Sequence, residues 1–127
     1  MPLAANAQEP AARITLIELT PHLAVNDAAA RIEAEDYATA VELLDGFLEN
    51  STAPPPEAFY LRGLAHYKLG DFAKALPAAQ RAATMASDAP ASWLELVVAL
   101  LKERGDHLQA IPWLERLVEL TPETKTY

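Results

Sequence analysis

A step of 35 residues recurs along the chain and restricts its fold more than any other feature. Residues of matching type return at this distance in five separate registers. Such a period is typical of arrays in which each repeat packs only on its neighbours. The sequence therefore predicts a stack of repeats and not a single globular core. The sets are Asp36, Asp71 and Asp106; Ala40, Ala75 and Ala110; Val41, Leu76 and Ile111; Tyr37, Phe72 and His107; and Pro77 with Pro112.

The composition predicts that each repeat is helical. Of 127 residues, 51% are hydrophobic, and alanine, leucine and glutamate dominate over β-branched residues. Proline-rich or Ser/Asp-rich breaks at 51–56 and 87–90 divide the chain into segments, because proline disfavours helix at and before its own position. The fold class expected is an all-α solenoid of antiparallel helix pairs, with about six helices and a short N-terminal segment. The expected helices are 21–34, 37–50, 57–69, 72–86, 90–104 and 107–120.

The two helices of each pair are joined by Glu35-Asp36, Gly70-Asp71 and Gly105-Asp106. Glycine takes the left-handed conformation that ends many helices, and the aspartate that follows is a favoured N-cap residue. We therefore expect each aspartate to cap the second helix of its pair.

With this pattern the chain resembles the tetratricopeptide repeat (TPR) family. The resemblance covers residues 21–122 and implies a TPR-like superhelix that binds proteins without catalysis. It divides the domain into repeats at 21–55, 56–89 and 90–122, between an N-terminal arm (1–20, with a short capping helix or a strand over 13–19) and a C-terminal tail (123–127). The matching residues are Phe59, Gly63, His66, Gly70, Asp71, Phe72, Ala75 and Ala82; Trp93, Leu96, Gly105, Asp106, Ala110, Leu114, Leu117 and Pro122; and, in a degenerate first repeat, Ala28, Asp36, Tyr37, Ala40, Leu44 and Phe47.

Two features bear on how closely the helices pack. Gly63 lies where the first helix of the middle pair would cross its partner, so that a side chain there would hold the backbones apart. Phe59 and Trp93 are 34 residues apart, although the other marks step by 35. This difference predicts one additional residue near 102–104 in the third pair.

Composition argues against several classes of function. The net charge is −8, and no cluster of Lys and Arg is present that would displace counterions from nucleic acid or bind an anionic membrane. The chain has no cysteine, and His22, His66 and His107 lie in different repeats without a second ligand at metal-binding spacing. We therefore expect no enzyme activity, no cofactor, no metal and no membrane insertion, with His66 acting as a packing residue.

The function expected from the resemblance is that of a protein-binding scaffold or adaptor. In TPR proteins the ligand groove is lined by the first helix of each pair. Carried over to this sequence, that groove holds Glu57, Tyr60, Leu64, Tyr67 and Lys68, together with Leu94, Val98 and Lys102. Packing on neighbouring helices is the alternative role for these side chains. A clamp for chaperone C-termini is not expected, because the positions that would form it hold Val25, Ala29, Tyr60, Leu61, Ala91 and Glu95.

A second hypothesis concerns self-assembly at the end of the array. A solenoid needs a polar element over its last apolar face. The sequence places Trp113, Leu117 and Leu120 on this face, which would pack on another subunit or on further repeats of a longer chain. The final residues resemble weakly the repeats of bacterial cell-envelope TPR proteins. The location is cytoplasmic by default, or periplasmic if Ala5-Asn6-Ala7 is the remnant of a signal-peptide cleavage site.

Overall fold

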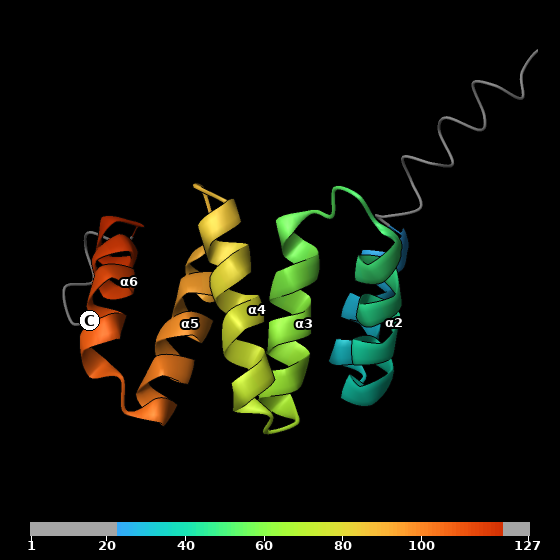
Figure 1. Ribbon diagram of the computed structural model, residues 1–127, viewed down its shortest axis with the longest axis horizontal. Coiled ribbons are helices and arrows are strands. Elements are labelled where there is room, and N and C mark those ends of the chain that lie inside the picture. Colours follow the sequence, from blue (N-terminus) through green and yellow to red (C-terminus); the bar gives the residue numbers. More distant parts are fainter. Residues whose placement is uncertain (1–22, 121–127) are drawn as a thin grey trace, which may run out of the picture.

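The computed structural model describes residues 23–120, which form six helical segments and no strand. Helices α2 to α6 stand side by side in chain order along the long axis of the molecule, and the segment 23–33 lies at the α2 end (Figure 1). The all-α fold class expected from the sequence is thereby confirmed. The arm (1–20), the segment 13–19, the Ala5-Asn6-Ala7 motif and the tail (123–127) lie outside the described residues. The helical segments are residues 23–33, α2 (Tyr37–Asn50), α3 (Pro56–Lys68), α4 (Phe72–Met85), α5 (Ala91–Arg104) and α6 (His107–Leu120).

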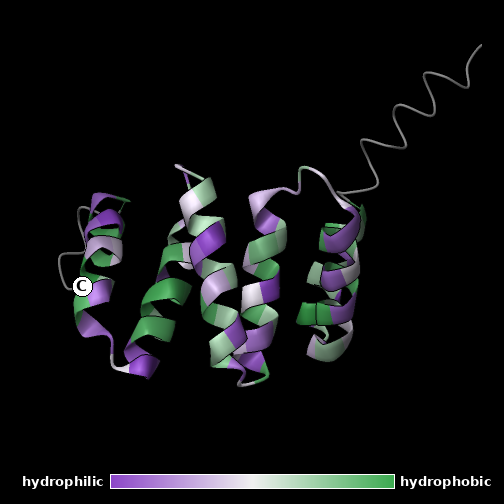
Figure 2. Ribbon diagram, in the orientation of Figure 1, coloured by the Kyte–Doolittle hydropathy of each residue, from purple (hydrophilic) through white to green (hydrophobic). Residues whose placement is uncertain are grey.

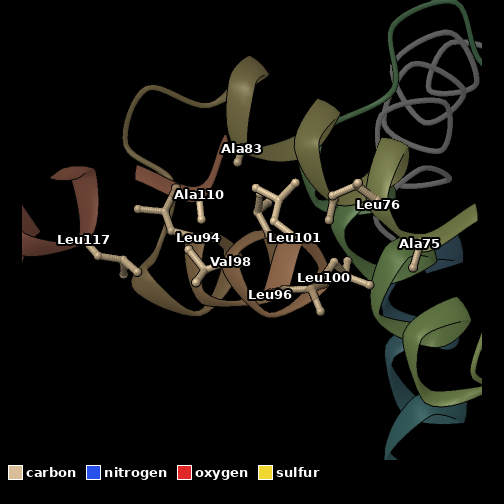
Figure 3. Close-up of a cluster of buried hydrophobic side chains, with 12 residues drawn as sticks. Ala75, Leu76, Ala83, Leu94, Leu96, Val98, Leu100, Leu101, Ala110 and Leu117 are labelled. Carbon is tan, nitrogen blue, oxygen red and sulfur yellow. The ribbon is translucent and has the colours of Figure 1, made fainter. Parts of the chain in front are cut away.

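Each helix packs mainly on its neighbours in the chain, as expected of a repeat array. The most extensive contact joins α3 to α4, and α3 also touches α5 across the intervening helix. The larger hydrophobic cluster lies between α4, α5 and α6, and side chains from all three helices point into it (Figure 3). A smaller cluster joins residues 23–33 to α2 and α3. Hydrophobic residues are most continuous along α5 (Figure 2). This helix packs against both α4 and α6, so it buries residues on several of its sides.

Gly63 explains the close approach of α3 and α4. A Cβ atom at this position would lie 3.0 Å from the backbone nitrogen of Ala79 and 3.1 Å from the carbonyl oxygen of Ala75. Both contacts are with backbone atoms, which cannot move aside as a flexible side chain would. The prediction that Gly63 marks the helix crossing is confirmed.

The three joints share one backbone geometry. Gly70 and Gly105 have φ angles of 82° and 80°, and Glu35 adopts 63° at the equivalent position. After each of them, the aspartate N–H donates to the carbonyl oxygen five residues earlier, at 2.8 to 2.9 Å, which closes the end of the first helix.

The predicted capping role of the aspartates holds for Asp71 but is wrong for Asp36. The Asp71 carboxylate accepts a hydrogen bond from the backbone N–H of Lys74 at 3.4 Å. Asp36 makes no such bond, and its carboxylate instead lies 3.9 Å from the Arg31 guanidinium. The carboxylate of Asp106 lies 3.2 Å from Arg104. At Asp36, the ion pair with a basic residue of the preceding helix therefore takes the place of the capping hydrogen bond.

The third pair keeps the 35-residue step, so the prediction of one additional residue near 102–104 is wrong. Pro55 and Pro90, the N-cap residues of α3 and α5, are 35 apart, and so are Gly70 and Gly105. Leu94 therefore takes the position of Phe59, and Trp93 takes that of Ala58. Buried residues follow the same step: Phe59 and Leu94, Leu61 and Leu96, Gly63 and Val98, Ala65 and Leu100, and His66 and Leu101.

Candidate partner-binding site

Four half-buried side chains lie on the first helices of the second and third pairs, and three of them also pack against the larger hydrophobic cluster. Tyr60, Leu64 and Tyr67 recur along α3 at helical spacing, and Trp93 joins them from α5; we call these four residues the aromatic strip. The rings of Tyr60 and Trp93 are stacked, with centroids 5.1 Å apart and planes 12° apart. The strip therefore spans two repeats and is held by ring stacking at their junction.

The second end of the strip is fixed by a different aromatic contact. Tyr67 packs against Phe72 at the start of α4, with ring centroids 5.6 Å apart and planes inclined by 36°. Because Phe72 directly follows the α3–α4 joint, the conformation of that joint determines where the Tyr67 ring lies. Both ends of the strip are thus positioned by aromatic packing.

The hydroxyl of Tyr60 adds a polar group to this apolar surface. Burial raises the pKa of Tyr60 above its usual value, a hydrogen bond with the Ser92 side chain opposes this change, and the nearby Glu95 carboxylate adds to the increase. Tyr60 is therefore neutral near pH 7, and its hydroxyl can donate or accept a hydrogen bond at the edge of the strip.

Charged side chains border the strip. Glu57 and Lys68 lie on α3, and Lys102 lies on α5; all three are exposed. The sequence predicts that these residues line the groove, and the structure brings them to the surface of the first helices. Their charges are of both signs, so the border does not favour a strongly acidic or a strongly basic ligand.

The structure corrects two of the predicted groove residues. Leu94 is fully buried and Val98 is 6% exposed, and both belong to the core cluster between α4 and α6. Their predicted place on the surface follows from an alignment of the third repeat that is one residue out of register. In the correct register, Glu95, Ala99 and Lys102 replace Tyr60, Leu64 and Tyr67. The third repeat therefore contributes the charged Glu95 and Lys102, the small Ala99 and the half-buried Trp93.

The C-terminal face also differs from its prediction. Leu117 is 1% exposed and packs in the core, so it is not part of an open face. Trp113 is half-buried, with the Arg116 guanidinium 5.6 Å from its ring centroid, and only Leu120 of the three is well exposed. Besides Leu120, the large apolar residues that α6 exposes are Leu108, Ile111 and Val118. The 35-residue step could have identified Ile111 and Val118 from their equivalents in α4.

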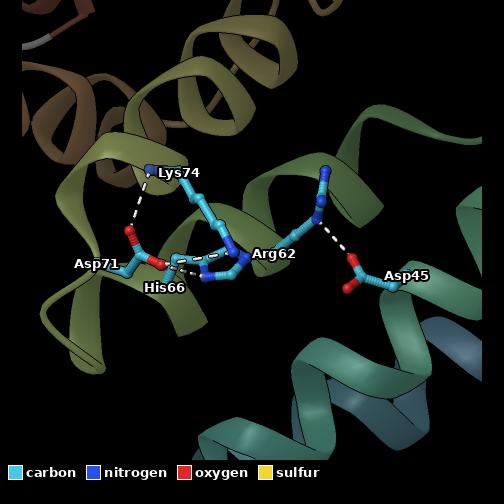
Figure 4. A network of polar contacts seen from close by, with 5 residues as sticks. All are labelled: Asp45, Arg62, His66, Asp71 and Lys74. Atoms are coloured by element: carbon cyan, nitrogen blue, oxygen red, sulfur yellow. Dashed lines mark hydrogen bonds and ion pairs between the residues drawn. The ribbon is translucent and has the colours of Figure 1, made fainter.

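A polar network lies on the other side of α3, at its contacts with α2 and α4 (Figure 4). The Arg62 guanidinium Nε is 2.7 Å from a carboxylate oxygen of Asp45, which ties α3 to α2. The neighbouring His66 is 5% exposed, and its Nδ1 lies 4.0 Å from the Asp71 carboxylate. Burial, followed by the positive charge of Arg62, lowers the pKa of His66 below its usual value. A buried neutral imidazole of this kind fits the predicted packing role.

Residues 23–120 contain neither a metal-binding cluster nor a membrane span. No group of three or more His, Cys, Asp or Glu side chains in this range could hold a metal ion. None of the helices within it is both long enough and apolar enough to span a membrane.

Comparison with known families agrees with this architecture. The family model for the tetratricopeptide repeat matches the chain twice, at residues 27–90 and 60–123, and the two matches overlap in the α3–α4 pair. Curated proteins give no significant match. Repeats of this kind generally mediate protein–protein interactions. The two matches together span most of the chain, and the protein therefore belongs to the tetratricopeptide repeat family.

Proposed function

We propose that the protein is a non-enzymatic scaffold that binds a segment of a partner protein along the aromatic strip. The observation that carries this proposal is the stacked pair of Tyr60 and Trp93, two half-buried aromatic rings that meet at the junction of two repeats. Aromatic side chains of this kind provide much of the affinity in protein interfaces because they bury large areas at a low cost in side-chain entropy.

The composition of the surface indicates the kind of segment that would bind. Leu64 and the two tyrosine rings offer apolar contact, while Glu57, Lys68 and Lys102 on the border can fix the orientation of the segment through its polar groups. An apolar segment with a few polar side chains, either helical or extended, fits such a surface better than a charged tail.

Selection from a phage-displayed library of random peptides tests the proposal. Enriched peptides, labelled with a fluorophore, are titrated with wild-type protein, with Tyr60→Ala and with Leu108→Ala. Leu108 is an exposed apolar residue of α6 and serves as a control for non-specific apolar binding. We expect Tyr60→Ala to weaken binding by about tenfold or more, with the helical circular dichroism spectrum and the affinity of the control unchanged.

Peptides that bind Tyr60→Ala as tightly as the wild-type protein would contradict the proposal. So would a set of peptides whose affinity falls only in the Leu108→Ala control, since that result would place the binding surface on α6.

A further inference from the structure

The outer face of α6 is an apolar surface whose counterparts elsewhere in the molecule are covered. Ile111 and Val118 are 46% and 39% exposed, whereas their equivalents one repeat earlier, Leu76 and Ala83, are 3% and 0% exposed. Leu76 and Ala83 belong to the core cluster that α4 forms with α5. The repeat itself therefore shows what kind of element covers this face, namely the first helix of another pair.

One position on the second helices, one turn after that of Ile111, is acidic in the first and third pairs, and in the first pair this residue has a defined role. Asp45 of α2 lies one turn after Val41, the equivalent of Ile111, and its carboxylate pairs with Arg62 of the covering helix α3 at 2.7 Å. On α6 this position is Glu115, which is exposed. The middle pair differs, because α4 has Gln80 there and α5 has the buried, apolar Val97 at the position of Arg62. An acidic residue at this position thus occurs with an arginine on the covering helix, and a neutral residue occurs with an apolar one.

A second copy of this chain does not have the complementary charge. If the helix at residues 23–33 of another copy covered α6 as α3 covers α2, the residue at the position of Arg62 would be Asp27. Its side chain is 52% exposed and would face Glu115, while Arg31 of the same helix already pairs with Asp27 and with Asp36, each at 3.9 Å. Two carboxylates would meet in the interface, and each copy carries a net charge of −8, so head-to-tail stacking is electrostatically unfavourable.

We infer that the outer face of α6 binds an arginine-bearing α-helix of a partner protein. That helix would present small or apolar residues spaced like Ala58, Leu61 and Ala65 to Ile111 and Val118, and an arginine spaced like Arg62 to Glu115. This surface is separate from the aromatic strip, and the inference does not depend on the proposed function.

A charge-reversal experiment on the full chain tests this inference. The probe is a synthetic peptide with the sequence of residues 55–69, kept helical by Gly63→Ala and by a hydrocarbon staple between positions 60 and 64, which lie away from the binding face. Calorimetry then measures four combinations: the peptide or its Arg62→Glu form, with the wild-type protein or with Glu115→Arg. We expect either single reversal to weaken binding by about tenfold, and the double reversal to restore it.

Two controls keep the result specific. Glu103→Arg makes the same change of charge at an exposed site on α5 and should leave binding unchanged. Tyr60→Ala, which disrupts the aromatic strip, should also have no effect, so that failure of the proposed function and failure of this inference give different results. The inference is overturned if the peptide does not bind at millimolar concentration, or if neither charge reversal changes its affinity.

Sedimentation equilibrium of the wild-type protein tests for the other occupant, a second copy of the chain. We expect a mass near 13.8 kDa at all concentrations. A mass that increases with concentration and returns to the monomer value in Ile111→Glu would show that a second copy occupies the face, and would also overturn the inference.

Discussion

Gly63 is the residue on which the α3–α4 contact most depends. Replacing it with alanine would place a Cβ atom 3.0 Å from the Ala79 backbone, and the two helices would have to separate. We predict that Gly63→Ala lowers the free energy of unfolding by about 1–3 kcal/mol, the usual range for overpacking, even though alanine favours helix. Urea denaturation followed by circular dichroism measures this change.

Gly46 provides the matched control for Gly63. It lies in α2, and a Cβ atom added there would have nothing within 4 Å, so the extra methyl group meets no neighbour. Gly46→Ala should therefore raise the free energy of unfolding by about 0.5–1 kcal/mol. If both variants gained stability to the same extent, the close approach at Gly63 would not be the reason for a glycine there.

His66 makes the stability of the array depend on pH. Burial, and then the positive charge of Arg62, lowers its pKa below the usual value of 6.5, so the folded state favours the neutral imidazole. The stabilisation from this group is therefore complete above pH 6.5 and is lost as the pH falls below that value towards the lower pKa of the folded state. Asp71 and Asp45 act against this shift, and Lys74 adds to it.

The substitution His66→Leu isolates this contribution. Within residues 23–120 neither ring nitrogen of His66 has a hydrogen-bond partner, so leucine removes unpaired polar atoms and the titration together. We predict that the wild-type protein loses more stability between about pH 7.5 and 5.5 than His66→Leu does, in urea denaturation at each pH. Equal losses in the two proteins would assign the pH dependence to carboxylates elsewhere.

At the scale of the helix, α6 is held on the array by an arginine as well as by apolar packing. The guanidinium of Arg116 donates hydrogen bonds to the carbonyl oxygens of Ala83, at 3.1 Å, and Ala86, at 3.3 Å. Ala83 lies in the last turn of α4 and Ala86 is its C-cap residue, whose carbonyl oxygen also accepts a hydrogen bond from the Ala89 N–H. The helix dipole favours a positive charge at this end. One side chain therefore completes the end of one helix and fixes the position of another.

Arg116→Met should cost about 1–3 kcal/mol of unfolding free energy, because methionine keeps most of the apolar contact and removes the hydrogen bonds. Arg104→Met is the control, since Arg104 is exposed and its pairing with Asp106 should contribute about 1 kcal/mol or less. Hydrogen exchange would locate the effect, with faster exchange of the α6 amides in Arg116→Met alone. Similar losses in the two variants would contradict this role for Arg116.

The helices show how much of the fold the sequence could predict. The boundaries of α2 and α6, the glycine joints and the crossing at Gly63 depend on local spacing, which a periodic sequence contains. The prediction that Leu94 and Val98 of α5 lie on the surface is wrong. It aligns Trp93 with Phe59 because both are aromatic, whereas burial follows the 35-residue step, which aligns Leu94 with Phe59. Arg116 could not be placed from sequence, since its carbonyl partners are 30 and 33 residues away.

At the scale of the whole molecule, the stack presents two different surfaces. The aromatic strip lies on first helices and crosses between repeats, whereas the outer face of α6 lies at the end of the described array (Figure 1). Each can be predicted in part from sequence: Tyr60, Leu64 and Tyr67 because their spacing is that of one helix, and the open α6 face because every repeat needs a neighbour. Which residues belong to each surface depends on how the repeats align with one another, and only the packed structure shows that alignment.

A partner segment bound on the aromatic strip would cover Trp93, and quenching of Trp93 fluorescence shows whether it does. In a Trp113→Phe background Trp93 is the only tryptophan, because the chain has two. Acrylamide quenching is measured with and without a peptide selected on the wild-type protein. We predict that the bound peptide shields Trp93 and reduces quenching, and that Tyr60→Ala abolishes this protection at the same peptide concentration. Unchanged quenching of Trp93 at saturating peptide would show that the partner binds elsewhere, contrary to the proposed function.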